Sequence, residues 1–308
     1  MDPAPILRRD LVSLVLAAVS WGLGTVVSKA ALGEIPPVSL LATQLASSLV
    51  VLAILMRAQG IPLRGDTSPL LARLGILNPG MAYALGLLGL MTITASMSVL
   101  LWALEPVMIL VLAAIVLRER LTPAILMLSG AALGGIVLVV YDPASMAGQA
   151  VGIGLALAGI ACCAAYTVIT RRTIPDARET SQVVFAQQAY GLLFALLLVA
   201  TFAVLGQPVA PARLTPLGVT SALVSGVLYY AGAYWLYLGA LRRVPASIAA
   251  GSFYLIPIVG VAAGAVVLGE RLSTLQWIGA GVVLAAVLGI LLRSMPAGRP
   301  IVVAARQI

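Results

Sequence analysis

The chain has 308 residues, of which 62% are hydrophobic and only 9% are charged, and its formal net charge is +8. A soluble domain of this size could not bury so much apolar surface, so the composition excludes a soluble protein and predicts an all-α integral membrane protein. The positive charge then indicates attraction to the inner leaflet of a lipid bilayer, and no nucleic-acid partner is expected.

Ten apolar stretches are each long enough to cross a bilayer core as a helix, which takes about 20 residues. In chain order they cover residues 11–32, 38–56, 74–90, 91–117, 122–141, 151–170, 183–205, 216–241, 246–268 and 275–292. The third and fourth stretches form one apolar run whose single charge is Glu105, so we expect the chain to fold back near Thr92. The predicted fold is a bundle of ten transmembrane helices.

The same segment occurs twice in the chain. Residues 82–133 align without a gap onto residues 233–284, and the most similar blocks read VLRERLT and VLGERLS. Five predicted helices per copy is an odd number, so the second copy must cross the membrane in the opposite direction. Inverted repeats are typical of secondary transporters, because two opposed halves can expose one site to either side. We expect a first repeat over 1–145, an inverted one over 146–294 and a cytoplasmic tail over 295–308.

The distribution of basic residues sets the orientation. If the N-terminus is cytoplasmic, fifteen of the 18 basic residues fall on inner segments, and the outer side holds only Lys29, Arg213 and Arg271. The positive-inside rule then places both termini in the cytoplasm. The connection over 142–148 is expected outside and that over 173–180 inside.

Several helix boundaries carry start signals. Thr122 and Thr215 each precede a proline and are expected to cap a helix N-terminus, and Ser273 with Gln276 has the spacing of a capping box. The Glu-Arg-Leu motif that precedes Thr122 and Ser273 is therefore interpreted first as a helix stop followed by a helix start. A direct role of this motif in transport is the alternative.

The usual catalytic groups are missing from the chain. It has no histidine, and with Lys29 as its only lysine it lacks the phosphate loop of ATPases. It also lacks the nucleophile elbow of serine hydrolases. Cys162 and Cys163 are adjacent in an apolar stretch and are interpreted as small buried residues. We expect no enzyme activity, no metal site and no cofactor; an intramembrane hydrolase stays open as an alternative.

Prolines interrupt three of the predicted spans. Pro106 and Pro257 occupy equivalent mid-span positions in the two repeats, and Pro79 lies in an Asn-Pro-Gly sequence of the third span. A proline frees a backbone carbonyl, and such a break is tolerated where it faces protein or a water-filled cavity. The breaks either line a pathway or only kink the helices for packing, and the sequence leaves both interpretations open.

Aromatic and polar side chains inside the spans are the candidates for a substrate cavity. Tyr230, Tyr234 and Tyr237 fall at i, i+4 and i+7, so one face of the eighth helix should carry all three, and Tyr83 is the repeat equivalent of Tyr234. Packing without substrate contact is the alternative for each of them. The predicted substrate-binding residues are Trp21, Tyr83, Trp102, Glu105, Tyr166, Tyr230, Tyr234, Tyr254, Gln44 and Gln187.

Glu105 is the only acid deep inside a predicted span. A charge at the bilayer centre costs about 2.5–3.5 kcal/mol on insertion scales, so such a residue is a functional hypothesis by default. Its repeat equivalent is Ile256. The alternatives are that Glu105 caps the backbone freed by Pro106 or stays protonated. For Gln44 and Gln187, hydrogen bonds between helices are the alternative to substrate binding.

The motifs WGLGTVVSKAAL, ALEPVMILVLAAIVLRERLT and YLIPIVGVAAGAVVLGERLS resemble the paired EamA-type repeats of the drug/metabolite transporter superfamily, and the resemblance covers nearly the whole chain. Among members it is most similar to bacterial amino-acid exporters of the YddG type. The resemblance implies a cavity framed by the first, third, fourth, sixth, eighth and ninth helices, with the fifth and tenth outside it. Many relatives carry an arginine where this chain has Gln44, which argues against a strongly anionic substrate.

The predicted function is a secondary transporter that exports amino acids or similar small metabolites across the bacterial inner membrane by alternating access. The substrate class comes from the resemblance. One alternative is an exporter of cationic or lipophilic drugs, and another, from a different class, is a membrane enzyme or a non-transporting assembly subunit. The expected partners are a small-molecule substrate and the lipid bilayer, and the protein is expected to be a monomer or a weak homodimer.

Overall fold

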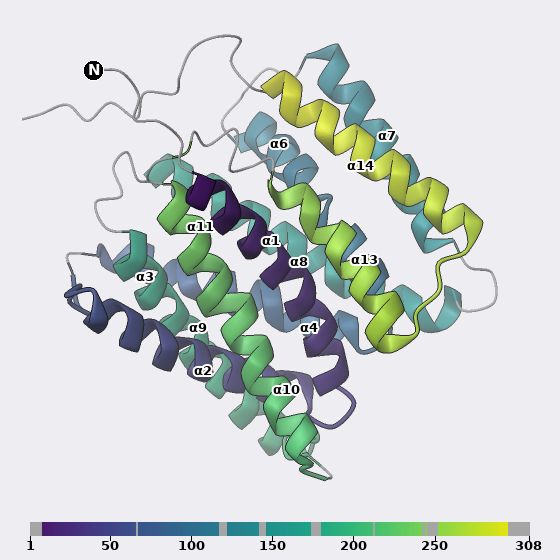
Figure 1. Cartoon of the computed structure of the whole chain (residues 1–308). Helices are drawn as coiled ribbons and strands as arrows, with labels where there is room; N and C mark the ends of the chain where they lie inside the picture. The colour runs from purple at the N-terminus through teal and green to yellow at the C-terminus, as the bar shows by residue number, and fades with distance from the viewer. Residues whose placement is uncertain are drawn as a thin grey trace, which may run out of the picture.

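The computed structural model describes residues 8–65, 67–116, 122–141, 146–173, 180–211, 213–241, 244 and 252–294, and every regular element within them is helical. The first half contains α1 (Arg8–Ala31), α2 (Pro37–Ala58), α3 (Pro69–Arg73), η1 (Leu74–Ile76), η2 (Leu77–Met81), α4 (Ala82–Leu90), α5 (Ala95–Trp102), α6 (Glu105–Val116) and α7 (Pro123–Val140). The second half contains α8 (Met146–Thr173), α9 (Thr180–Val204), α10 (Pro216–Gly226), η3 (Val227–Gly232), α11 (Ala233–Leu241), η4 (Ser252–Tyr254), α13 (Leu255–Leu268) and α14 (Thr274–Ser294). Figure 1 shows these helices as one bundle.

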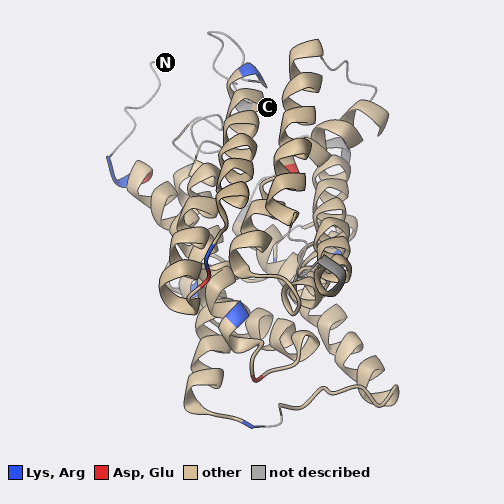
Figure 2. Ribbon diagram, turned by 90° about the vertical axis from the view of Figure 1, so that its right-hand side faces the viewer, with Lys and Arg blue, Asp and Glu red and all other residues tan. Residues whose placement is uncertain are grey.

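The helices are apolar enough to lie in a membrane. The described residues contain eight helical segments that are long and apolar enough to cross one, and two shorter apolar helices over Ser252–Leu268 and Thr274–Ile290. Figure 2 shows long stretches of helix that carry no charged residue. The chain is therefore a multi-pass helical membrane protein, and the count of ten spans stays a prediction.

The third and fourth spans show where the sequence prediction was right and where it was wrong. The chain turns between α4 and α5, which brackets the fold-back predicted near Thr92. The third span, however, begins at Pro69 and not at Leu74. The reason is a capped helix start, because the Ser68 hydroxyl accepts a hydrogen bond from the Leu71 amide (3.3 Å) and proline follows at the first helical position.

The predicted helix caps are confirmed. The hydroxyls of Thr122 and Thr215 accept hydrogen bonds from the third following amides, at 3.4 and 3.1 Å. Ser273 and Gln276 form both bonds of a capping box, at 2.9 and 3.2 Å. α13 ends at Gly269, whose φ of 67° is the left-handed conformation that glycine adopts most easily.

Helices α7 and α14 lie side by side at one flank of the bundle (Figure 1). A Cβ atom added at Gly279 would lie 2.6 Å from the Gly135 carbonyl oxygen, so glycine at both positions lets the two helices approach closely. Neither helix contributes a residue to the central pocket described below. This agrees with the expectation that the fifth and tenth helices stand outside the cavity.

The two halves share an irregularity as well as a sequence. In the first half the π-helical segment η2 directly precedes Ala82, and in the second half the π-helical segment η3 directly precedes the equivalent Ala233. The pairs α6 with α13 and α7 with α14 also follow at the spacing of the sequence repeat. Local geometry is therefore duplicated together with sequence.

Candidate functional site

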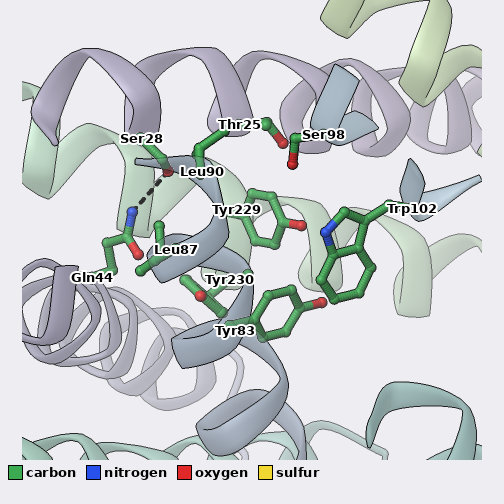
Figure 3. A pocket seen from close by; sticks show the side chains of 11 residues that line it. Thr25, Ser28, Gln44, Tyr83, Leu87, Leu90, Ser98, Trp102, Tyr229 and Tyr230 are labelled. Carbon is green, nitrogen blue, oxygen red and sulfur yellow. Dashed lines mark hydrogen bonds between the residues drawn. The ribbon is translucent and has the colours of Figure 1, made fainter. Parts of the chain in front are cut away.

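A small pocket lies between the helices of the bundle (Figure 3). Its walls come from α1, α2, α4, α5 and η3, and they consist of Thr25, Ser28, Gln44, Tyr83, Gly86, Leu87, Leu90, Ser98, Trp102, Tyr229 and Tyr230. Its volume is about 30 Å³, which is about the room of one water molecule. A solute of metabolite size therefore fits only after the surrounding helices move.

Aromatic rings form one side of the pocket. The rings of Tyr83 and Trp102 are stacked, with centroids 5.3 Å apart and planes 12° apart. Tyr229 and Tyr230 each meet Tyr83 edge to face, with centroids 5.3 Å apart. A Cβ atom at Gly86 would lie 3.3 Å from the Trp102 indole, so this glycine makes room for the ring. The result is a wall of π faces and hydroxyl groups.

The opposite side of the pocket is polar and centres on Gln44, whose side chain is 1% exposed. Its Nε2 donates to the hydroxyl oxygens of Ser28 and Ser225, both at 2.8 Å. These two bonds use both amide hydrogens, and Oε1 has no hydrogen-bond partner within the described part of the chain. In Figure 3 this oxygen points away from Ser28, toward Leu87 and Tyr230. The pocket thus offers an unused, buried acceptor for a donor group of a ligand.

The pocket wall contains no Lys, Arg, Asp or Glu among the residues that the structure describes. Four of the ten predicted substrate-binding residues belong to it: Gln44, Tyr83, Trp102 and Tyr230. The sequence prediction missed Thr25, Ser28, Ser98 and Tyr229. It also expected walls from the sixth and ninth helices, whereas the described wall includes the second helix and neither of those.

Tyr230, Tyr234 and Tyr237, which were predicted to share one face, have partly different neighbours, although Tyr234 also hydrogen-bonds with Tyr83 of the pocket wall. Tyr230 lines the pocket, while Tyr234 and Tyr237 pack on Trp21, with ring centroids 5.5 and 5.7 Å from it. The cause is the π-helical turn η3, which holds more residues per turn than an α-helix and so changes the angular position of every later side chain. It also turns Tyr229 toward the pocket.

Three other predicted residues make contacts between helices away from the pocket. The Tyr166 hydroxyl donates to Oε1 of Gln187 (2.9 Å), and Nε2 of Gln187 donates to the Leu71 carbonyl (3.1 Å). The Tyr254 hydroxyl donates to the Val287 carbonyl in α14 (2.6 Å). In this conformation all three side chains hold helices together.

The predicted helix breaks coincide with changes of helix type or direction. Pro79 lies in the π-helical η2, next to the non-helical Asn78 (φ −144°, ψ 115°). Pro106 lies in the first turn of α6, and Pro257 lies in the first turn of α13, directly after the 3-10 segment η4. The two equivalent prolines therefore begin helices and do not kink them from the middle.

Glu105 stands at the start of α6, close to the pocket residue Trp102. Its Oε1 accepts a hydrogen bond from the Cys163 thiol (3.2 Å), and Nδ2 of Asn78 donates to the same sulfur (3.2 Å). No bond from Glu105 to the backbone near Pro106 is found in the described part of the chain. The structure therefore does not support the interpretation of Glu105 as a cap for that backbone.

Lys29 holds the turn between α4 and α5 from one side. Its Nζ donates to the carbonyl oxygens of Leu90 (2.7 Å), Met91 (3.3 Å) and Ile93 (2.9 Å). The last carbonyls of a helix lack partners within it and carry partial negative charge, so a cation stabilises them. The end of α1 is thereby tied to the end of α4.

Glu270 holds the same turn from its other side. Its Oε1 accepts from the Ala95 amide (2.7 Å), and its Oε2 accepts from the Ser96 amide (2.8 Å) and the Ser96 hydroxyl (2.6 Å). The carboxylate satisfies free N–H groups at the N-terminus of α5, in short charge-assisted bonds. We refer to Lys29, Glu270 and the turn over residues 90–96 as the clasp.

The clasp separates two spaces. On one side Leu90 of the clasp lines the central pocket. On its other face Ser96 and Glu270 line a cavity of about 290 Å³, together with Val261, Ala265, Arg271, Leu272 and Trp277. The Glu-Arg-Leu motif at Glu270 is thus more than a helix stop and start, because its carboxylate bonds to a helix of the other repeat. Its counterpart, residues 119–121, lies outside the described residues.

A second carboxylate acts at the same end of the bundle. Glu34, between α1 and α2, accepts bonds from the Thr215 hydroxyl (2.7 and 2.8 Å) and the Thr215 amide (3.1 Å). Thr215 is itself the cap of α10. At this end, polar groups of the first half and the second half therefore hold each other in two places.

A bundle of apolar helices long enough to cross a bilayer defines the class of multi-pass helical membrane proteins. The sequence matches the family model described as "EamA-like transporter family" twice, over residues 10–141 and 150–292, and the chain belongs to that family. No curated protein matches it. Among 18 matching chains of solved structures, one titled "Crystal structure of protein" has a TM-score of 0.62 and 17% sequence identity, covering 92% of this chain and 96% of that one. That likeness concerns the fold alone.

Proposed function

We propose that this chain is a secondary transporter that exports amino acids or similar small metabolites across the bacterial inner membrane by alternating access. Family membership supports a transporter of small molecules. The observation that carries the finer proposal is the central pocket, which joins an aromatic wall to a buried acceptor with no partner.

The chemistry of the pocket favours a ligand with an amino group. The oxygen of Gln44 accepts from a donor, and the faces of Tyr83 and Trp102 attract a cation with about 0.5–2 kcal/mol, more when the cation is desolvated. No arginine or lysine of the described wall would balance a phosphate or sulfate. An amino acid or an amine fits this wall better than a nucleotide sugar does.

The clasp supports alternating access. In this proposal it closes the pocket toward one membrane face, and its Glu270 bonds to Ala95 and Ser96 join the two repeats. Solute release on that face requires these bonds to break. The distribution of basic residues places this face outside. In this proposal the ten spans form two inverted repeats over 1–145 and 146–294, and the tail over 295–308 lies outside the described residues.

A second candidate function is export of cationic or lipophilic drugs. The four aromatic rings of the described pocket wall favour this alternative, because planar apolar ligands and cations both bind aromatic faces. The two candidates differ in whether the Gln44 acceptor is used. Loss of transport on Gln44→Leu would favour amine-bearing metabolites, and full retention would favour drugs.

A panel of solutes tests the proposal. Purified protein in liposomes is loaded in turn with labelled amino acids, aromatic amines, quaternary drugs and sugar phosphates, and efflux is compared with protein-free liposomes. We expect efflux of at least one amine-bearing class and none of sugar phosphates. A folded protein that moves no solute of the panel would contradict the transporter proposal.

The inverted topology makes a separate prediction. A single cysteine placed at Ser145 should be labelled by an impermeant thiol reagent in intact cells, and one placed at Asp176 should not, because the inner segments carry fifteen of the 18 basic residues. Both positions lie outside the described residues. Labelling at position 176 without labelling at 145 would invert the orientation, and labelling at both would refute the odd number of spans between them.

A further inference from the structure

Three polar side chains meet beside the pocket. They come from three elements: Asn78 from η2, Glu105 from α6 and Cys163 from α8. Asn78 Nδ2 donates to Cys163 Sγ, and the thiol donates to Glu105 Oε1, each over 3.2 Å. Burying each of these polar side chains in an apolar bundle costs free energy unless the side chain is hydrogen-bonded. Such a hydrogen-bonded chain of three is therefore a candidate functional site.

Asn78 adds an observation of its own. The side chain is 7% exposed, and its Oδ1 has no hydrogen-bond partner within the described residues. The same Asn78 side chain donates through Nδ2 to the Cys163 sulfur, whose thiol donates to Glu105. The cluster therefore contains one buried acceptor, Asn78 Oδ1, without a partner among the described residues.

No cation in the described part of the chain balances Glu105. The titratable groups that face it or its thiol partner are two cysteines of α8 and tyrosines of α4, α8, η3 and α11: Cys162, Cys163, Tyr83, Tyr166, Tyr229 and Tyr234. None of these carries a positive charge. Lys29 is bound to the carbonyls of the clasp. The remaining way to neutralise the carboxyl group in this closed conformation is to bind a proton.

The cluster is also coupled to the pocket. Tyr229 lines the pocket wall and lies within electrostatic range of both Glu105 and Cys163. Tyr83, on the same wall, is coupled to Cys163 as well. The residue Glu105 is half-buried, whereas Cys163 and Asn78 are buried. A change of charge at Glu105 therefore changes the electrostatic potential in the pocket where the ligand would bind.

We propose that Glu105, Cys163 and Asn78 form a proton-binding site beside the substrate pocket, in which the Glu105 carboxyl group carries the proton and the thiol and amide position it. The proposal rests on the transporter function proposed above and names its co-transported ion. When the pocket opens to water, the carboxyl O–H releases its proton to water and leaves a carboxylate. Before the pocket closes again, that carboxylate is neutralised by a new proton or by the positively charged ammonium group of a solute. One can therefore be exchanged for the other.

An infrared measurement tests the site without any knowledge of the substrate. The difference spectrum of wild type minus Glu105→Gln, in detergent at neutral pH, should contain the C=O band of a protonated carboxyl group. Cys163→Ala removes the donor to Oε1 and should shift this band. Cys162→Ala is the matched control, because Cys162 has no hydrogen bond to Glu105 in the described structure, and it should leave the band in place.

A flux measurement tests the role of the site. Liposomes that contain a pH-sensitive dye should change internal pH when wild-type protein exchanges a mixture of amino acids, and Glu105→Gln should lose this proton movement. Absence of the infrared band, or proton movement that survives Glu105→Gln, would overturn the proton site. A band with the expected shift in a protein that moves no solute would keep the site and refute the transporter function, so the two failures are distinguishable.

Discussion

Replacing Glu270 with glutamine is expected to release the clasp and to shift the protein toward conformations open on that face. The carboxylate accepts three bonds from Ala95 and Ser96, at 2.6–2.8 Å. Hydrogen bonds to charged groups contribute about 1.5–3 kcal/mol each, so even partial loss changes the ratio of closed to open states about tenfold or more. The amides at 95 and 96, protected in the closed state, should exchange hydrogen for deuterium correspondingly faster.

Hydrogen–deuterium exchange of a peptide that covers residues 91–98 provides this measurement. The matched control is Ser273→Ala, which removes the cap of α14 three residues after Glu270 but touches nothing in α5. Exchange in the peptide should remain at the wild-type rate in this control. If Glu270→Gln also leaves that rate unchanged in a folded protein, the clasp does not hold the closed state.

Replacing Trp102 with alanine is expected to reduce transport strongly at normal membrane abundance. The indole stacks on Tyr83 and forms much of the aromatic wall. Loss of a cation–π contact of about 0.5–2 kcal/mol weakens apparent affinity by about two- to thirtyfold. Tyr83→Ala should act in the same direction, because it removes the stacked partner. The measurement is the concentration dependence of efflux from liposomes.

Tyr141→Ala is the matched control for Trp102, since that aromatic side chain is 50% exposed and lies at the end of α7, away from both cavities. It should transport as wild type does. Trp102→Phe keeps a π face and should restore part of the affinity. Equal rates for wild type, Trp102→Ala and Tyr83→Ala would show that the aromatic wall is packing alone and that the pocket is not the binding site.

The helical bundle followed from the sequence because its signals are local. Hydrophobic length predicted the spans, and the hydroxyl–proline pairs at Thr122 and Thr215 predicted helix starts that the structure contains. The start at Pro69 was missed because Arg73 interrupts the apolar pattern there, although Ser68 carries the same start signal. A search for caps as well as for apolar length would have found it.

The site followed from the sequence only in part. Regular helical periodicity grouped Tyr230 with Tyr234 and did not include Tyr229, which the π-helical η3 also brings to the pocket. The clasp joins Lys29 and Glu270 to a turn far from both in sequence. Periodicity within one helix does not predict which side chains of different helices contact one another. The duplicated Glu-Arg-Leu motif was visible, but the partner of its carboxylate was not.

Solute counterflow tests the central claim most directly. Liposomes containing purified protein are filled with unlabelled amine-bearing solute and diluted into a trace of the labelled form, with no gradient of pH or voltage. A transporter with one alternately exposed pocket predicts transient accumulation of label above equilibrium, abolished or greatly reduced by Trp102→Ala. Label that only equilibrates, at the same rate in wild type and Trp102→Ala, would contradict alternating access through this pocket.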